Sequence, residues 1–107
     1  MALDTFSKQA YEVFWISSSF VTNLGSSEAI VIADSTVTVT DDSGVDVTSE
    51  IIVTSTFSVD TTHQIAQVQI KGGAEESSPY KITFRIATDS SPANKWENDL
   101  EMQVEEL

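Results

Sequence analysis

Cysteine is absent from this chain of 107 residues, and basic residues, histidine, glycine and proline are scarce. Without cysteine there is neither a disulfide bond nor a thiolate metal site, so the core must be held by packing alone. The longest apolar run, 29–33, falls far short of the ~20 residues that span a bilayer. The first residues, 1–8, lack the basic start and apolar run of a secretory signal. We therefore expect no membrane contact and no export by a signal peptide.

The charge of the chain is one-sided, because 17 acidic residues face five basic ones, for a net charge of −12. A phosphate backbone would be repelled over most of this surface, so we expect no nucleic-acid partner. Copies of the chain also repel each other at low salt, which predicts a monomer in isolation. A basic protein surface or a divalent cation is the partner that the charge favours.

Side chains that carry catalysis form no recognisable arrangement in the sequence. His63 is the only histidine, and neither a Ser-His-Asp nor a Cys-His signature accompanies it. A metal site at His63 would need a second soft ligand, which the chain lacks. Gly72 and Gly73 lead neither into a helix nor into the Gly-Lys-Thr of a phosphate loop. We predict no enzyme activity, no cofactor, and no catalytic, cofactor-binding or metal-binding residues.

Asp41, Asp42 and Asp46 surround Gly44 in an oxygen-rich turn. Such turns can hold Ca²⁺ when carbonyl oxygens complete about six to eight ligands, but the spacing does not match an EF-hand loop. Aspartate and serine side chains also commonly bond their own backbone in hairpin turns. We interpret this segment as a solvated turn, with a bound cation as the open alternative.

The clearest strand follows a turn signal near residue 80. Gly72 and Gly73 permit unusual backbone conformations, and Pro79 removes a ladder donor, so the preceding strand ends there. Apolar and polar residues then alternate, which predicts a half-buried strand over 80–86. Its apolar positions are Tyr80, Ile82, Phe84 and Ile86.

The remaining segments also favour strands, because none shows a convincing helical period. The expected strands are an early edge strand around Phe6, then 11–20, 36–40, 45–47, 51–53, 54–59, 63–70 and 96–104. Two registers are open for 63–70: either Ala66, Val68 and Ile70 point inward, or a bulge brings Ile65 into register. In 11–20 aromatic residues fall on both faces, and we expect Phe14 and Trp15 to pack in the core.

About seven short strands in a single domain, 1–107, match an all-β, immunoglobulin-like antiparallel sandwich better than a barrel. In that fold, a tyrosine at the start of the second-last strand bonds back across a corner, two residues before a cysteine of antibody domains. Tyr80 occupies the place of this tyrosine, and Ile82 the place of the cysteine.

Segments spread over nearly the whole chain carry a resemblance to known proteins: 8–16, 28–30, 37–39, Gly72-Gly73, 80–85, Thr88 and 100–104. Together they resemble a family of small tailed-phage and prophage proteins. The family consists of immunoglobulin-like virion accessory proteins of about this length, some of which are described as fibre-tail adaptors. The resemblance implies a structural protein that contacts other virion proteins in the tail or fibre attachment region. It also implies synthesis in the bacterial cytoplasm and a final place in the virion.

A free-standing binding module for carbohydrate or a host surface is the alternative, since sandwiches commonly present ligands on loops or on one sheet face. Aromatic placement discriminates between the two, because a glycan site needs exposed tryptophan or tyrosine side chains that lie side by side. If Trp15 and Trp96 are both buried, this alternative loses its best candidates.

The two chain ends are expected at sheet edges, where a partner strand can add by main-chain hydrogen bonds. Acidic residues near the C-terminus would line such an edge, oppose self-pairing and favour a basic partner. They are Glu97, Asp99, Glu101, Glu105 and Glu106.

Overall fold

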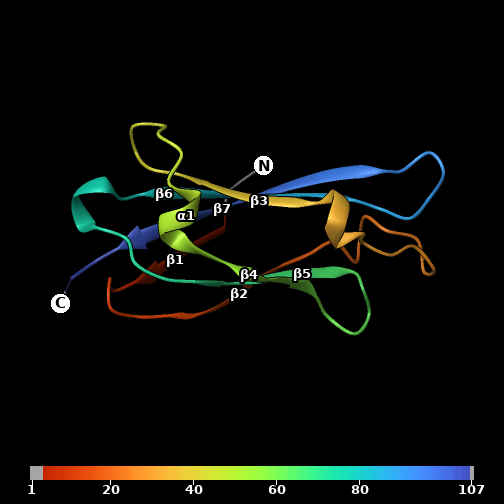
Figure 1. Ribbon diagram of the computed structural model, residues 1–107, viewed down its shortest axis with the longest axis horizontal. Helices are drawn as coiled ribbons and strands as arrows, with labels where there is room; N and C mark the ends of the chain where they lie inside the picture. Colours follow the sequence, from red (N-terminus) through yellow and green to blue (C-terminus); the bar gives the residue numbers. More distant parts are fainter. Residues whose placement is uncertain (1–3, 107) are drawn as a thin grey trace.

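The computed structural model describes residues 4–106, which form two packed β-sheets (Figure 1). Short helical turns lie between some of the strands. The elements in chain order are β1 (Asp4–Lys8), β2 (Phe14–Ser19), η1 (Ile32–Asp34), β3 (Thr36–Thr40), α1 (Thr48–Ile51), β4 (Ile52–Val59), β5 (Ile65–Ile70), η2 (Glu75–Ser77), β6 (Tyr80–Ala87) and β7 (Lys95–Val104). Within the described residues, no helix is long and apolar enough to cross a membrane.

One sheet has the strand order β1-β7-β6-β3, and the other has the order β2-β5-β4. The immunoglobulin fold likewise places its third, sixth and seventh strands opposite its second, fourth and fifth. The first strand differs from the constant-type arrangement, because β1 runs parallel beside β7, whereas all other strand pairs are antiparallel. The prediction of an all-β sandwich of about seven strands is confirmed.

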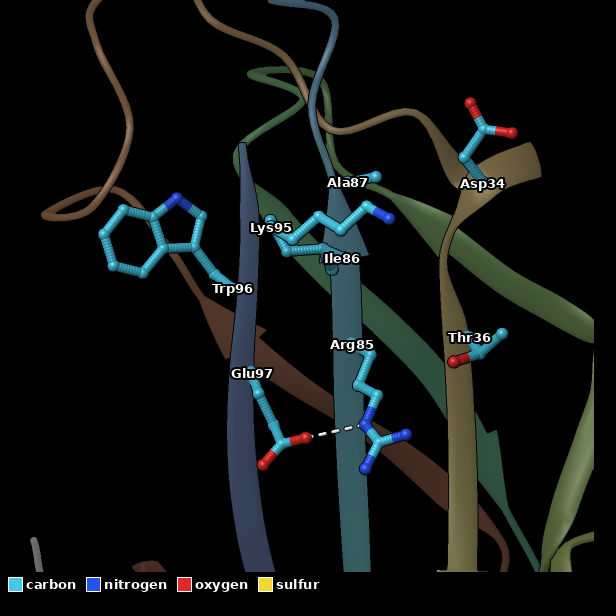
Figure 2. A pocket seen from close by; sticks show the side chains of 8 residues that line it. All are labelled: Asp34, Thr36, Arg85, Ile86, Ala87, Lys95, Trp96 and Glu97. Carbon is cyan, nitrogen blue, oxygen red and sulfur yellow. Dashed lines mark hydrogen bonds and ion pairs between the residues drawn. The ribbon is translucent and has the colours of Figure 1, made fainter. Parts of the chain in front are cut away.

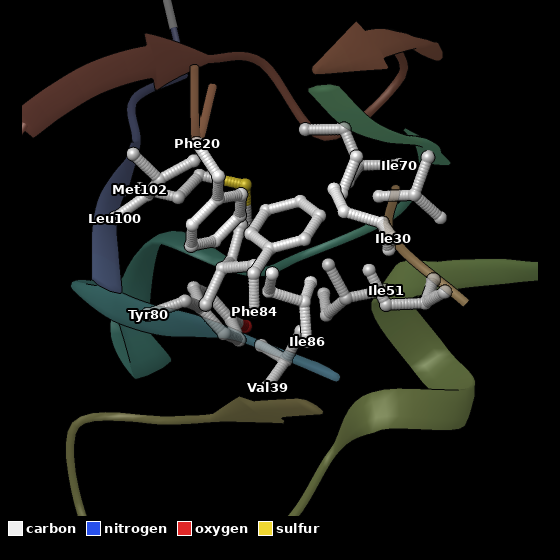
Figure 3. Close-up of a cluster of buried hydrophobic side chains, with 14 of the residues drawn as sticks. Phe20, Ile30, Val39, Ile51, Ile70, Tyr80, Phe84, Ile86, Leu100 and Met102 are labelled. Carbon is white, nitrogen blue, oxygen red and sulfur yellow. The ribbon is translucent and has the colours of Figure 1, made fainter. Parts of the chain in front are cut away.

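The core lies between the two sheets and is built by residues at alternate positions of the strands. Side chains from both sheets converge there, with Phe84 of β6 fully buried among them (Figure 3). Phe57 of β4 reaches across to Phe84, with ring centroids 6.3 Å apart. The predicted apolar face of 80–86 therefore faces the core from the four-stranded sheet.

Tyr80 forms the predicted tyrosine corner. Its side chain is buried, and its hydroxyl accepts a hydrogen bond from the backbone N–H of Ala74 at 2.9 Å. Ile82, at the place of the antibody cysteine, is completely buried. Gly73, the residue before Ala74, has a positive φ of 97°. The corner thus fixes the loop that leads into β6.

We expect Tyr80→Phe to lower the free energy of unfolding by about 0.5–2 kcal/mol, because one buried hydrogen bond is lost while the ring packing is kept. Urea unfolding of the two proteins at pH 7 measures the difference. An unchanged unfolding midpoint would mean that the hydroxyl does not stabilise the corner.

Of the two registers that were open for 63–70, the structure has the one with Ala66, Val68 and Ile70 inward, since all three are completely buried. The bulge lies on the neighbouring strand instead. β4 pairs with β5 at Val53 and again at Ser58, with an irregularity between these positions.

Two strand predictions are wrong in part. β2 begins only at Phe14, so residues 11–13 are not strand. The expected strand 45–47 is replaced by an isolated bridge, Thr40 to Asp46, whereas the expected strands 51–53 and 54–59 are one strand, β4, which begins at Ile52 after the helical turn α1. The Asp46 carboxylate accepts hydrogen bonds from both the backbone N–H and the hydroxyl of Thr48, and such local bonds compete with strand pairing.

Candidate functional site

The single histidine lies on a surface turn and not in a cluster of reactive groups. His63 is exposed and has a positive φ of 59°, and its backbone N–H donates to the backbone carbonyl of Asp60 at 3.1 Å. Across residues 4–106, no three His, Asp or Glu side chains are grouped closely enough to hold a metal ion. The geometry around His63 is that of a turn between β4 and β5.

The acidic turn uses its carboxylates to hold its own backbone. Asp41 accepts hydrogen bonds from the N–H groups of Ser43 and Val45 at 2.9 and 3.0 Å. The hydroxyl and N–H of Thr48 donate to Asp46 and hold the pKa of that carboxyl below its usual range. These bonds engage one oxygen of each carboxylate in the local turn structure, as expected for side chains that hold their own backbone.

Acidic residues gather at one end of the sandwich, which we call the acidic end. The loops 9–13, 41–47 and 71–79 meet there with the C-terminal residues (Figure 1, left). It holds more than half of the 17 acidic residues. They are Glu12, Asp41, Asp42, Asp46, Glu50, Glu75, Glu76, Glu105 and Glu106. Residues far apart in the sequence thus form one strongly negative surface.

Hydrogen bonds tie the loops of the acidic end together. The N–H of Ala10 donates to the carboxylate of Glu106 at 2.8 Å, and the N–H of Glu106 donates to Glu75 at 3.0 Å. The N–H of Asp42 donates to the carbonyl of Ser77 at 3.0 Å. The negative charges are therefore carried by loops that are fixed to one another.

A cleft of about 310 Å³ opens among these loops. Its lining includes the acidic residues Asp41 and Glu50 and the corner residues Gly73 and Tyr80. The hydrogen bond between Tyr80 and Ala74 fixes one wall of this cleft. The cleft is therefore preformed and could receive a basic side chain.

Lys8, at the end of β1, does not offset this charge at the surface. The residue is only 2% exposed, and its ammonium donates to the carbonyls of Gln9 at 2.8 Å, Ala10 at 3.3 Å and Gly72 at 2.6 Å. Burial lowers the pKa of Lys8, and the nearby carboxylate of Glu12 acts in the opposite direction. The cation is enclosed by backbone oxygens, so it is not available to a partner.

The outer face of the four-stranded sheet differs, because two of its acidic residues form ion pairs. Arg85 bonds Glu97 at 2.6 Å across β6 and β7 (Figure 2), and Lys81 lies 3.5 Å from Asp99. The strand β7 lies between β1 and β6 in the sheet. The predicted edge along 96–104 is therefore wrong over 100–104, which pair with β1, and the edge strand is β1. Glu97 and Asp99 face cations on β6.

Five charged or polar side chains and Trp96 surround a second cleft, of about 340 Å³, on that face. Figure 2 shows Lys95 and Arg85 on one side of β7, whereas the ring of Trp96 points away on the other side. Trp96 is 39% exposed. Both acidic and basic side chains line this cleft, so it favours neither anionic nor cationic ligands.

The three-stranded sheet contains no charged residue in any of its strands, β2, β4 and β5. Its outward-facing residues form a surface that we call the neutral face. They are Trp15, Ser17, Ser19, Val53, Ser58, Ile65, Gln67 and Gln69. Trp15 is 53% exposed, so the expectation that it packs in the core is wrong, whereas Phe14 is half-buried against the core. The absence of charge in these segments was visible in the sequence, but the sequence did not show that they are neighbours.

Glu28 joins two loops at the opposite end of the sandwich. Its carboxylate accepts hydrogen bonds from the N–H of Gly25 at 3.1 Å and from the amide of Asn94 at 2.8 Å. A hydrogen bond from Thr88, these two bonds and one from Ser90 lower the pKa of Glu28 to about 2. This carboxylate therefore has a structural role.

We expect Glu28 to make stability depend on pH in acid. Because its pKa is depressed in the folded state, its stabilising contribution is complete above the ordinary value of 4.5 and is lost as the pH falls toward 2. Denaturant unfolding of the wild type and of Glu28→Gln from pH 7 to pH 2.5 measures this. The stability difference should shrink below pH 4.5, and a constant difference would contradict the assignment.

Comparison with known proteins adds no family to this description. No protein-family model matches the chain, and no curated protein matches it in sequence. The features that bear on function are therefore the acidic end, the neutral face and the sequence resemblance.

Proposed function

We propose that this chain is a non-enzymatic structural protein of a tailed-phage or prophage particle, acting by protein–protein contact in the tail or fibre attachment region. Its docking surface is the acidic end, and its partner is a virion protein with a basic surface. The observation that carries the proposal is the gathering of more than half of the acidic residues at one end of the sandwich, where a cleft lined in part by Asp41 and Glu50 opens. The phage assignment is supported by the sequence resemblance.

Electrostatics explains why the acidic end would select its partner. Surface charges within about 10 Å act together at ordinary salt, so clustered carboxylates create a stronger field than the same charges spread over the surface. Lys8 is enclosed by carbonyl oxygens and does not weaken this field at the surface. Complementary charge of this kind speeds association and rejects acidic partners.

The same field keeps copies of the chain apart. Two acidic ends cannot approach each other without strong repulsion, so the isolated chain is a monomer in this proposal. Assembly then requires a partner of opposite charge, as expected for an adaptor between unlike proteins.

Calorimetric titration with the purified products of adjacent tail and fibre genes tests the proposal. We expect one basic product to bind, with affinity falling at least ten-fold between 50 and 300 mM salt, because screening weakens the charge attraction. The variant Glu50→Gln/Glu76→Gln/Glu105→Gln removes exposed charges of the acidic end and should weaken binding at low salt.

The matched control is Asp4→Asn/Asp34→Asn/Glu101→Gln, which removes the same number of charges from other surfaces. It should bind nearly as tightly as the wild type. Equal losses in the two variants would show that net charge and not the acidic end is responsible. The proposal would be refuted if none of the tail and fibre gene products bound, or if binding did not depend on the salt concentration.

A further inference from the structure

The neutral face is chemically unlike the rest of the surface. The three strands beneath it carry no charge, although the chain has a net charge of −12. From this surface we infer a second binding function, independent of the acidic end: the neutral face binds an uncharged glycan chain, with Trp15 as the stacking platform.

The strand register places an aromatic ring beside amide and hydroxyl groups. Trp15 of β2 is directly opposite Gln69 of β5, and Gln69 is opposite Val53 of β4. Directly opposed residues on one face have Cβ atoms about 4.5–5.5 Å apart. The side chains of Trp15 and Gln69 are therefore neighbours on this face, close enough for one sugar ring to contact both.

The next row of the face continues this pattern. Ser17, Gln67 and Ser58 lie in register across the same three strands, with the Gln67 amide nitrogen 3.3 Å from the Ser58 hydroxyl. Within residues 4–106, the side chains of Ser17 and Gln69 make no hydrogen bond. Hydroxyl and amide groups both donate and accept, as sugar hydroxyls do.

The shape of the surface favours a chain over a small molecule. The two clefts described above lie elsewhere, while the neutral face is the open side of a sheet. A shallow hollow of about 630 Å³ adjoins the start of β2 and is lined by Tyr11, Val13, Phe14 and the acidic-end residue Glu12. Tyr11 is 95% exposed. A polymer lying over Trp15 could extend toward this second aromatic residue.

Charge decides which glycans are suitable. An acidic polysaccharide would be repelled by the surrounding negative charge and would find no cation on the face. A neutral chain has no such penalty, and its apolar ring faces can stack on the indole. A second copy of this protein is a less suitable occupant, because the exposed apolar residues of the face are few and both copies carry the same net charge.

Affinity electrophoresis in native gels tests the inference. The gels contain dextran, galactomannan or hydroxyethylcellulose as neutral probes, or alginate as an acidic one. We expect at least one neutral probe to retard the wild-type protein, and alginate to leave its mobility unchanged. Trp15→Ala should weaken the retardation at least ten-fold, because it removes the stacking platform.

Trp96→Ala is the matched control, since Trp96 is exposed but belongs to the other sheet, and it should retain binding. Thermal melting of both variants verifies that they are folded. The inference is overturned by retardation in none of the neutral probes, by equal retardation in alginate, or by binding that survives in folded Trp15→Ala. A wild-type dimer that Trp15→Ala disperses in sedimentation would also overturn it and would identify a second copy as the occupant. None of these outcomes affects the salt-dependent contact at the acidic end.

Discussion

Phe84→Ala is expected to lower the free energy of unfolding by about 3–5 kcal/mol, the usual cost of removing a large buried aromatic side chain. Phe84 is completely buried at the centre of the core, and Phe57 from the opposite sheet packs against it. The substitution removes contacts that join the two sheets and leaves a cavity. A loss of this size is a large fraction of the roughly 5–15 kcal/mol that stabilises a typical domain.

Denaturant unfolding at pH 7 measures the loss, with Phe84→Leu as a control that keeps most of the apolar volume. The leucine variant should lose clearly less stability than the alanine variant. If Phe84→Ala lost less than about 1 kcal/mol, the two sheets would not be packed through this residue.

Gly73→Ala is expected to lower the free energy of unfolding by about 2–4 kcal/mol, from backbone strain and overpacking together. Gly73 has a φ of 97°, which residues with side chains rarely adopt. A Cβ at this position would also lie 2.9 Å from a methyl carbon of Val104 and close to Met102.

Gly44→Ala separates the two causes. Gly44 also has a positive φ, 81°, but no atom lies within 4 Å of an added Cβ. This variant should therefore show the backbone cost alone and lose clearly less stability than Gly73→Ala. Equal losses in denaturant unfolding would show that the contact with Val104 contributes nothing.

Strands with one apolar face could be predicted from the sequence. In β6 strict alternation allows only one orientation toward the core, and Pro79 and the two preceding glycines mark where the strand begins. Tyr80 could be assigned to the corner because its position relative to the strand is set by local sequence. These features depend on neighbours in the chain and not on distant contacts.

The exposure of Trp15 could not be predicted in the same way. Its strand has large apolar residues on both faces, so either face could meet the core. The pairing of Phe14 and Ile16 with the buried residues Ile70 and Val68 of β5 decides the orientation. That pairing joins segments more than fifty residues apart, and it turns Trp15 outward.

The acidic end also depends on topology. Its carboxylates come from loops that are distant in sequence, and they meet only because the intervening strands return the chain repeatedly to the same end. The sequence showed a large negative charge but not its location. The prediction placed it along β7, where cross-strand cations pair two of the carboxylates.

The two surfaces suit different tasks in one small protein. The acidic end offers strong, salt-sensitive attraction to a basic protein, whereas the neutral face offers stacking and hydrogen bonding without charge. The neutral face follows one sheet, and the acidic end lies across the strand ends (Figure 1). Trp15 lies where the two surfaces meet, because it is the second residue of β2 after the loop 9–13.

Hydrogen–deuterium exchange of the chain, free and bound in assembled particles, tests docking through the acidic end. Binding should slow exchange in the loops 41–47 and 71–79 of the acidic end, while exchange in 21–31, 60–64 and 88–94 at the opposite end stays unchanged. Protection confined to that opposite end, or no protection anywhere in the particle, would contradict it.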